Sequence, residues 1–141
     1  MNRMMWRLSV VCVCAAFAGC SKPEYSGPQR FPLSGKVTYE GQPIDAGSIA
    51  FLPQGDGQRV SGGYIMEGVY SVPEAQGANA GKHRIEIRWQ RLTGKKTRDP
   101  HSEDVTEQRS EGLPAKYHKD SELTVEVSEE QTTFDFDLKA D

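Results

Sequence analysis

Three cysteines, Cys12, Cys14 and Cys20, lie close together near the start of the chain. Thiolates at such short spacing could bind a metal or form a redox pair. The neighbours Val11 and Val13 argue against both, because a reactive thiolate needs an electropositive, partly exposed environment. The role of these cysteines therefore depends on the segment that contains them.

Residues 1–19 have the pattern of an export signal. Arg3 and Arg7 precede an uncharged apolar stretch from Leu8 to Gly19, and the segment contains no acidic residue. A basic start, a short apolar stretch and small residues at its end are typical of a signal peptide. The stretch is shorter than the about 20 residues that a membrane span needs. The alternative, a buried helix of the mature domain, lacks the polar residues that would define a face.

The last residues of this segment, Phe17, Ala18, Gly19 and Cys20, resemble the lipobox of bacterial lipoproteins. In that family the cysteine sulfur receives a diacylglycerol, cleavage occurs just before the cysteine, and the new amino terminus is usually acylated. Phe17 departs from the usual leucine. The resemblance implies that Cys20 is a lipidation site and that the exported protein is anchored to a bacterial membrane, on its periplasmic or cell-surface side. Two or three acyl chains are enough for stable anchoring.

Cleavage before Cys20 would leave a mildly acidic chain of single-domain size. Removing Arg3 and Arg7 changes the formal charge from −3 to −5, which argues against a nucleic-acid partner. With one cysteine left, no internal disulfide is possible. Residues 20–32 contain prolines and glycine and predict a flexible tether behind the lipid anchor, although the last of them could form an edge strand.

No set of polar side chains predicts catalysis or a structural metal site. His83, His101 and His118 are scattered, and His83 is expected on the polar side of a strand. A structural metal site needs about four converging ligands. The stretch from His101 to Asp104 could offer some ligands, but a solvated loop is the favoured interpretation. No G-x-S-x-G nucleophile elbow is present, so no catalytic, metal or cofactor-binding residue is assigned.

Alternating apolar residues predict about seven short strands. In the clearest run, Ile85, Ile87 and Trp89 share one face. Glu67-Gly68 predicts a hairpin turn, and Glu129–Gln131 predicts another between the last two strands. This spacing predicts an all-β, two-sheet antiparallel sandwich. Its expected core, with Trp89 at the centre, consists of Val37, Tyr39, Ile49, Phe51, Ile65, Tyr70, Val72, Ile85, Ile87, Trp89, Leu123, Val125, Val127, Phe134, Phe136 and Leu138.

The strongly charged stretches are interpreted as solvent-exposed. Residues 92–112 lack apolar periodicity and favour a mobile loop, with a recognition element or a short helix over Ser102–Arg109 as alternatives. The basic cluster at 95–98 lies beside acids and fits a solvated loop better than a contact with an anionic polymer or lipid headgroups. Asp135 and Asp137 are expected on the solvent face of a strand.

Five short patterns follow one another in a characteristic order: a G-x-V strand, a G-x-P turn, a G-x-Y strand, a G-x-H/Y-x-I strand and an L-P-x-K-Y segment. In this chain they occur within SGKVTYEGQPIDAGSIAFLP, GVYSV, AGKHRIEI and LPAKYHKDSELTVEVSEEQTTFDFDL. From Leu33 to Leu138 the sequence resembles the carboxypeptidase regulatory-like, transthyretin-like domains of small bacterial lipoproteins, planctomycete ones especially. The resemblance implies a seven-stranded prealbumin-like sandwich over residues 33–141, with no catalytic activity and no ligand residues to transfer.

These observations predict a membrane-anchored, non-enzymatic cell-envelope lipoprotein. Sheet edges and the 92–112 segment would bind another envelope protein or a polysaccharide. A purely structural envelope module without a specific ligand is the alternative, and an enzyme is the third possibility.

The lipobox resemblance predicts that Cys20→Ser abolishes acylation and moves the protein from the membrane to the soluble fraction. Membrane binding would be lost because no acyl chain remains to enter the bilayer. The measurement is fractionation of cells with mass spectrometry of the amino terminus, and Cys14→Ser is the matched control. Unchanged membrane fractionation of the Cys20→Ser protein would contradict the prediction.

Overall fold

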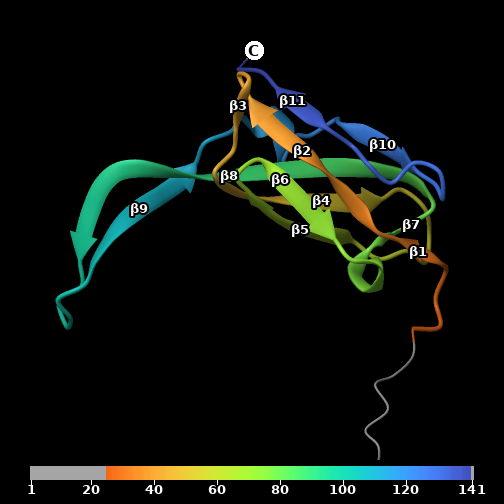
Figure 1. The fold of residues 1–141 in the computed structure, drawn as a ribbon, viewed down its shortest axis with the longest axis horizontal. Coiled ribbons are helices and arrows are strands. Elements are labelled where there is room, and N and C mark those ends of the chain that lie inside the picture. Colours follow the sequence, from red (N-terminus) through yellow and green to blue (C-terminus); the bar gives the residue numbers. More distant parts are fainter. Residues whose placement is uncertain (1–24, 141) are drawn as a thin grey trace, which may run out of the picture.

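The longest element of the fold is β8 (Gly81–Arg98), whose first half lies between β4 (Ala46–Pro53) and β10 (Thr124–Val127). The computed structural model describes residues 25–140, which fold into strands and two 3-10 turns (Figure 1). The other elements are β1 (Arg30–Phe31), β2 (Leu33–Tyr39), β3 (Gln42–Pro43), β5 (Ser61–Met66), β6 (Val69–Val72), η1 (Glu74–Gln76), β7 (Ala78–Asn79), β9 (Val105–Glu111), η2 (Ala115–Tyr117) and β11 (Phe136–Leu138).

The main sheet has the strand order β10-β8-β4-β5-β6-β2-β11, with β3 paired to β2 and β9 paired to β8. A separate small ladder joins β1 to β7. The ladders between named strands are antiparallel, except that β11 runs parallel to β2. Residues 25–140 are thus all-β with predominantly antiparallel sheets, as the alternation of apolar residues predicts.

The sheet folds over itself, because rings from strands that are not neighbours in the sheet pack together. Phe51 on β4 lies 6.0 Å from the ring of Tyr70 on β6 and 6.3 Å from that of Phe134. Tyr39 on β2 lies 5.8 Å from the ring of Trp89 on β8. Two layers that enclose one apolar core are consistent with a β-sandwich.

The predicted core is confirmed, since each of its residues lies in the buried cluster or packs against it. The expectation that Trp89 occupies the centre is wrong, because Trp89 is half-buried at one end of the core, whereas Phe51 is fully buried. Burial of a large apolar side chain contributes about 1.5–3 kcal/mol. Further buried residues lie outside clean alternating runs: Leu33, Ile44, Ala78, Leu113 and Tyr117.

One predicted hairpin is confirmed and the other is wrong. Glu67 and Gly68 have φ of 50° and 77° and form the two-residue turn between β5 and β6. The turn at Glu129–Gln131 does not return the chain along β10, because β10 pairs with β8 whereas β11 pairs with β2. The crossing is held where the N–H of Phe134 donates to the carbonyl of Ser34 at 3.0 Å.

His83 points into the core and not to the polar side, so that expectation is also wrong. It shares the inner face of β8 with Ile85 and Ile87, and all three are 0% exposed. Its Nδ1 lies 2.9 Å from the carbonyl oxygen of Gly81, whereas its Nε2 has no hydrogen-bond partner. The period of two along β8 therefore outweighs the polarity of the imidazole.

Tyr70 links β6 to the segment that precedes β11. Its hydroxyl donates to the carbonyl of Phe134 at 2.7 Å, and the residue is 1% exposed. Burial, with a smaller contribution from the Asp135 carboxylate, raises the pKa of Tyr70 above its usual value.

The raised pKa of Tyr70 predicts that the protein loses stability in alkaline solution. The unfolded tyrosine ionises near pH 10, so its contribution to folding is complete below about pH 10 and is lost as the pH rises further. Tyr70→Phe should lower the free energy of unfolding at neutral pH by about 1–2 kcal/mol, because it leaves a carbonyl unpaired. It should also weaken the alkaline loss.

The measurement is denaturant unfolding from pH 7 to 11, with Tyr64→Phe as the control because Tyr64 is 82% exposed. An alkaline stability loss of the same size in the Tyr70→Phe protein and in the unsubstituted protein would contradict this assignment.

Candidate interaction surface

The second half of β8 leaves the core and pairs with β9 as a two-stranded arm, defined here as residues 91–111 (Figure 1). Leu92 pairs with Arg109, and after a register shift the pairing extends outward to Arg98 and Val105. The structure therefore places paired strands over most of the segment for which the sequence favoured a mobile loop, and it shows no helix over Ser102–Arg109. The sequence did not predict the two strands of the arm, because neither has a buried face in this segment and neither therefore shows alternating apolar residues.

A bulge lies where the register of the arm shifts. The Thr93 hydroxyl donates to the carbonyl of Gln108 at 3.0 Å, and the N–H of Gly94 donates to the Glu107 carboxylate at 2.9 Å. Beyond the bulge, the amide of Gln108 donates to the Thr97 hydroxyl at 2.8 Å. Side chains thus replace the main-chain bonds that the shift interrupts.

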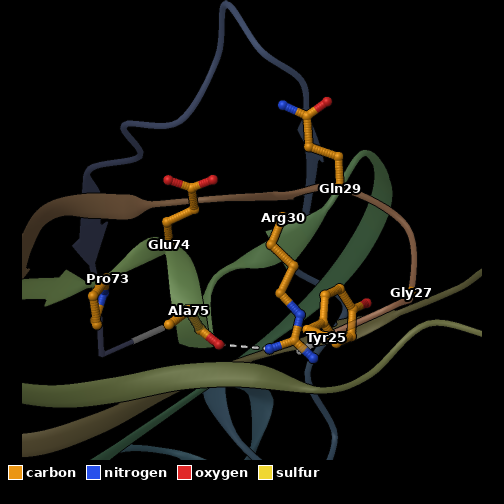
Figure 2. Close-up of a pocket in the computed structure, with 7 residues that line it drawn as sticks. All are labelled: Tyr25, Gly27, Gln29, Arg30, Pro73, Glu74 and Ala75. Atoms are coloured by element: carbon orange, nitrogen blue, oxygen red, sulfur yellow. Dashed lines mark hydrogen bonds between the residues drawn. The ribbon is translucent and has the colours of Figure 1, made fainter. Parts of the chain in front are cut away.

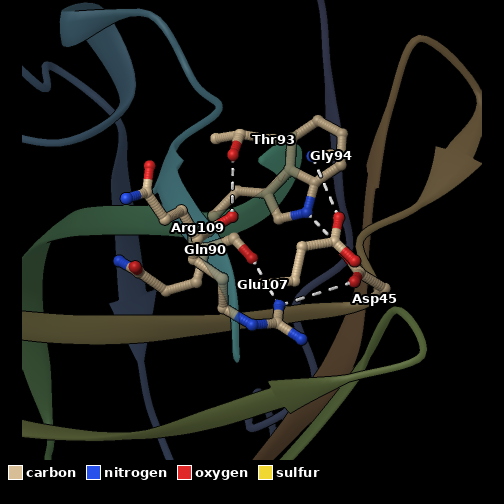
Figure 3. A network of polar contacts seen from close by, with 8 residues as sticks. Asp45, Gln90, Thr93, Gly94, Glu107 and Arg109 are labelled. Carbon is tan, nitrogen blue, oxygen red and sulfur yellow. Dashed lines mark hydrogen bonds and ion pairs between the residues drawn. The ribbon is translucent and has the colours of Figure 1, made fainter. Parts of the chain in front are cut away.

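The base of the arm is tied to the domain by the network in Figure 3. The indole N–H of Trp89 donates to the Asp45 carboxylate at 2.6 Å, and this bond is the main reason that the pKa of Asp45 is lowered. The Arg109 guanidinium donates to the carbonyl of Gln90 at 2.6 Å and lies 3.7 Å from Asp45. Because both charged groups are exposed, the ion pair itself contributes little.

A second set of contacts holds the end of β9 and the residues that follow it against Trp89. The Glu111 carboxylate accepts the N–H groups of Trp89 at 2.9 Å and of Leu113 at 3.1 Å. The N–H of Gly112 donates to the carbonyl of Trp89. A Cβ at Gly112 would lie 2.7 Å from the indole, so only glycine permits this approach.

The arm is exposed on both faces, with only Glu107 partly covered. No described strand pairs with the outer edge of β9, or with the edge of β8 that β4 leaves free beyond Trp89. The arm therefore offers two open edges and two open faces to a partner. Its basic residues are concentrated on the β8 side and acids at the turn: Arg91, Lys95, Lys96, Arg98, Asp99, Glu103 and Asp104.

The turn of the arm binds its own polar groups. The Asp99 carboxylate accepts the N–H of His101 at 2.8 Å, and the Ser102 hydroxyl lies 3.1 Å from Asp104. His83 and His118 lie in the core of the domain, so the three histidines do not converge. Within residues 25–140, no group of three or more His, Cys, Asp or Glu is placed to hold a metal ion.

The acids near the end of the chain lie on the solvent face, as predicted. Asp135 accepts the N–H of Lys36 at 2.7 Å, and Asp137 accepts the Thr38 hydroxyl at 2.8 Å. Lys139, 2.9 Å away, is the main cause of the lowered pKa of Asp137. These carboxylates stabilise the pairing of β11 with β2.

The predicted lipidation site, Cys20, lies outside the described residues. The first described residue, Tyr25, packs under the guanidinium of Arg30, with the Arg30 carbon 3.8 Å from the ring centroid (Figure 2). Arg30 also donates to the carbonyl of Ala75 at 2.6 Å. A hydrogen bond from the Asn79 side chain is the main cause of the lowered pKa of Tyr25.

The last part of the predicted tether is therefore attached to the domain. The Asn79 amide donates to the carbonyls of Pro28 at 2.8 Å and Gln29 at 2.9 Å, and β1 pairs with β7. Of the two expectations for the end of the 20–32 segment, the structure supports the edge strand.

Among the described residues, no helix is long and apolar enough to cross a membrane. Comparison with known proteins finds no matching family model, no matching curated protein and no matching solved structure.

The exposure of the arm predicts that it can be removed without unfolding the domain. Replacing residues 93–108 with Asn-Gly joins the paired residues Leu92 and Arg109 through a two-residue turn. It keeps the contacts of Trp89 and Arg109 with Asp45. We expect the free energy of unfolding to change by no more than about 1 kcal/mol. Trp89→Ala, which removes the base contact, should cost about 2 kcal/mol or more.

Urea unfolding of the two variants and the unsubstituted protein measures these effects. Loss of the folded state in the shortened protein would show that the arm is part of the folding unit.

Proposed function

We propose that this chain is an exported lipoprotein, anchored through Cys20, that binds another envelope protein or a polysaccharide and has no enzymatic activity of its own. The observation that carries the proposal is the arm. It extends beyond the core, is tied down only at its base, and keeps both faces and both edges open. A two-stranded ribbon is at best marginally stable alone, so selection for such an arm is easiest to explain by a partner.

The placement of the arm relative to the predicted anchor supports this function. β7, which pairs with the strand at the end of the tether, directly precedes β8, whose other end forms the arm. β8 has 18 residues, and an extended strand of 18 residues spans roughly 60 Å. Figure 1 accordingly has the first described residues and the arm at opposite sides of the molecule. A partner could reach the arm without being obstructed by the tether.

The seven-stranded, prealbumin-like sandwich of transthyretin-like domains remains part of the proposal. The path β10-β8-β4-β5-β6-β2-β11 contains seven strands. The quoted motifs fall on β2, β3, β6, β8 and the segment from Leu113 to β11, and β3 lies off this path. In this interpretation β9 and the outer half of β8 are an addition specific to this chain.

The decisive experiment places a photo-activated cross-linking residue in the full-length protein within its own membranes. With the cross-linker at His101, on the turn of the arm, we expect one dominant product other than the protein itself. A cross-linker at Glu126, exposed on β10, is the control for non-specific capture.

Mass spectrometry and glycan detection on the product distinguish an envelope protein from a polysaccharide. Equal capture at both positions, or none at His101, would reject recognition by the arm and favour the purely structural alternative.

A further inference from the structure

We infer that the arm is also a self-association element, in which the outer edge of β9 pairs antiparallel with β9 of a second copy around a two-fold axis at Gln108. This inference goes beyond the proposed function and requires neither the lipid anchor nor an envelope partner. It rests on the regularity of the β9 edge, the direction of its main-chain groups and the order of its charges.

The two open edges of the arm differ. The β8 edge carries Lys95, Lys96 and Arg98 next to the bulge at Gly94. Lysines and bulges are features that prevent strand pairing at an edge. By contrast β9 (Val105–Glu111) has no glycine, proline or lysine. The β9 edge is therefore the one suited to receive another strand.

The main-chain groups of alternate β9 residues point outward. The carbonyl of Gln108 accepts from Thr93, and the N–H of Gly112 donates to Trp89, so both face β8. Directions alternate along a strand, so the main chains of Glu107, Arg109 and the two end residues of β9 face away from β8. Two β9 edges can then exchange about eight hydrogen bonds, with Gln108 facing Gln108 of the second copy in a non-hydrogen-bonded pair.

Symmetry and charge select this register. A two-fold axis normal to the ribbon places side chains of the same face opposite one another in the two copies. One residue of β9 must therefore lie directly opposite its own equivalent in the second copy, and the axis passes between these two residues. Centring on Gln108, the middle of β9, overlaps the full strand and sets Glu107 opposite Arg109 of the second copy. It also pairs Thr106 with Ser110. Opposite charges and polar pairs across strands are stabilising.

The neighbouring registers place like charges together. Centring on Glu107 faces two carboxylates, and centring on Arg109 faces two guanidinium groups. Shifting farther shortens the overlap. Full overlap and charge complementarity therefore coincide at Gln108.

The same register brings charged groups together beyond the strands. With Gln108 at the axis, the acidic turn of one arm reaches the level of residues 112–117 in the second copy. Lys116 and Lys119 lie in and just after η2, and Lys119 is exposed. The acids of the turn, Asp99, Glu103 and Asp104, are opposite in charge to these two lysines, which lie beside Asp120 and Glu122.

Cysteine trapping in the full-length protein tests the register. At Gln108→Cys the two Cα atoms would be about 4.5 Å apart, within disulfide reach. At Thr106→Cys the equivalent atoms are displaced by four residues, about 14 Å. Mild oxidation of membranes should give a covalent dimer of the Gln108→Cys protein and no such dimer of the Thr106→Cys protein. The unsubstituted chain is the control, because it shows the background from its own cysteines.

A charge swap tests the pairing by a second route. Adding Arg109→Glu to Gln108→Cys should abolish the dimer, because Glu107 then faces a carboxylate. Further addition of Glu107→Arg should restore it. Equal trapping at 106 and 108, no trapping at 108, or no rescue by the swap would overturn the inference. None of these outcomes bears on capture of another envelope component at His101.

Discussion

The packing of the inner face of β8 is the constraint on which the rest of the structure depends. His83, Ile85 and Ile87 point from it into the core, while β4 and β10 occupy its two edges. A strand held on one face and both edges has a fixed direction at the point where its neighbours end. The arm is thus positioned by a core to which its own side chains contribute no buried surface.

Local signals in the sequence predicted the strands well but predicted their long-range pairing poorly. Alternation identified the core face of β8, and Glu67-Gly68 identified the turn of the β5–β6 hairpin. The short turn at Glu129–Gln131 suggested a second hairpin, but the parallel pairing of β11 with β2 depends on contacts such as Ser34 with Phe134. Such contacts join residues far apart in the chain and leave no periodic pattern.

The arm was missed for a different physical reason. Apolar residues alternate along a strand when one of its faces is buried. A ribbon with water on both faces has no buried face, so its sequence shows no such alternation. The features that define it are polar: the bulge at Thr93 and Gly94, and the self-bonded turn beginning at Asp99. The predicted position of His83 was wrong for another reason. The polarity of the histidine was given more weight than the alternation along β8, which places His83 on the same inward face as Ile85 and Ile87.

The proposed two-fold axis normal to the arm has a consequence if the chain is anchored to a bilayer through Cys20, as proposed. Rotation about an axis leaves heights along that axis unchanged, so both copies of Tyr25 lie at the same height. If the axis is normal to the membrane, both tethers reach the same bilayer and the paired arms lie parallel to it. Confinement to that surface also raises the effective concentration of one arm near another. Pairing through one short strand, too weak to hold a dimer in dilute solution, could then be sufficient at the membrane.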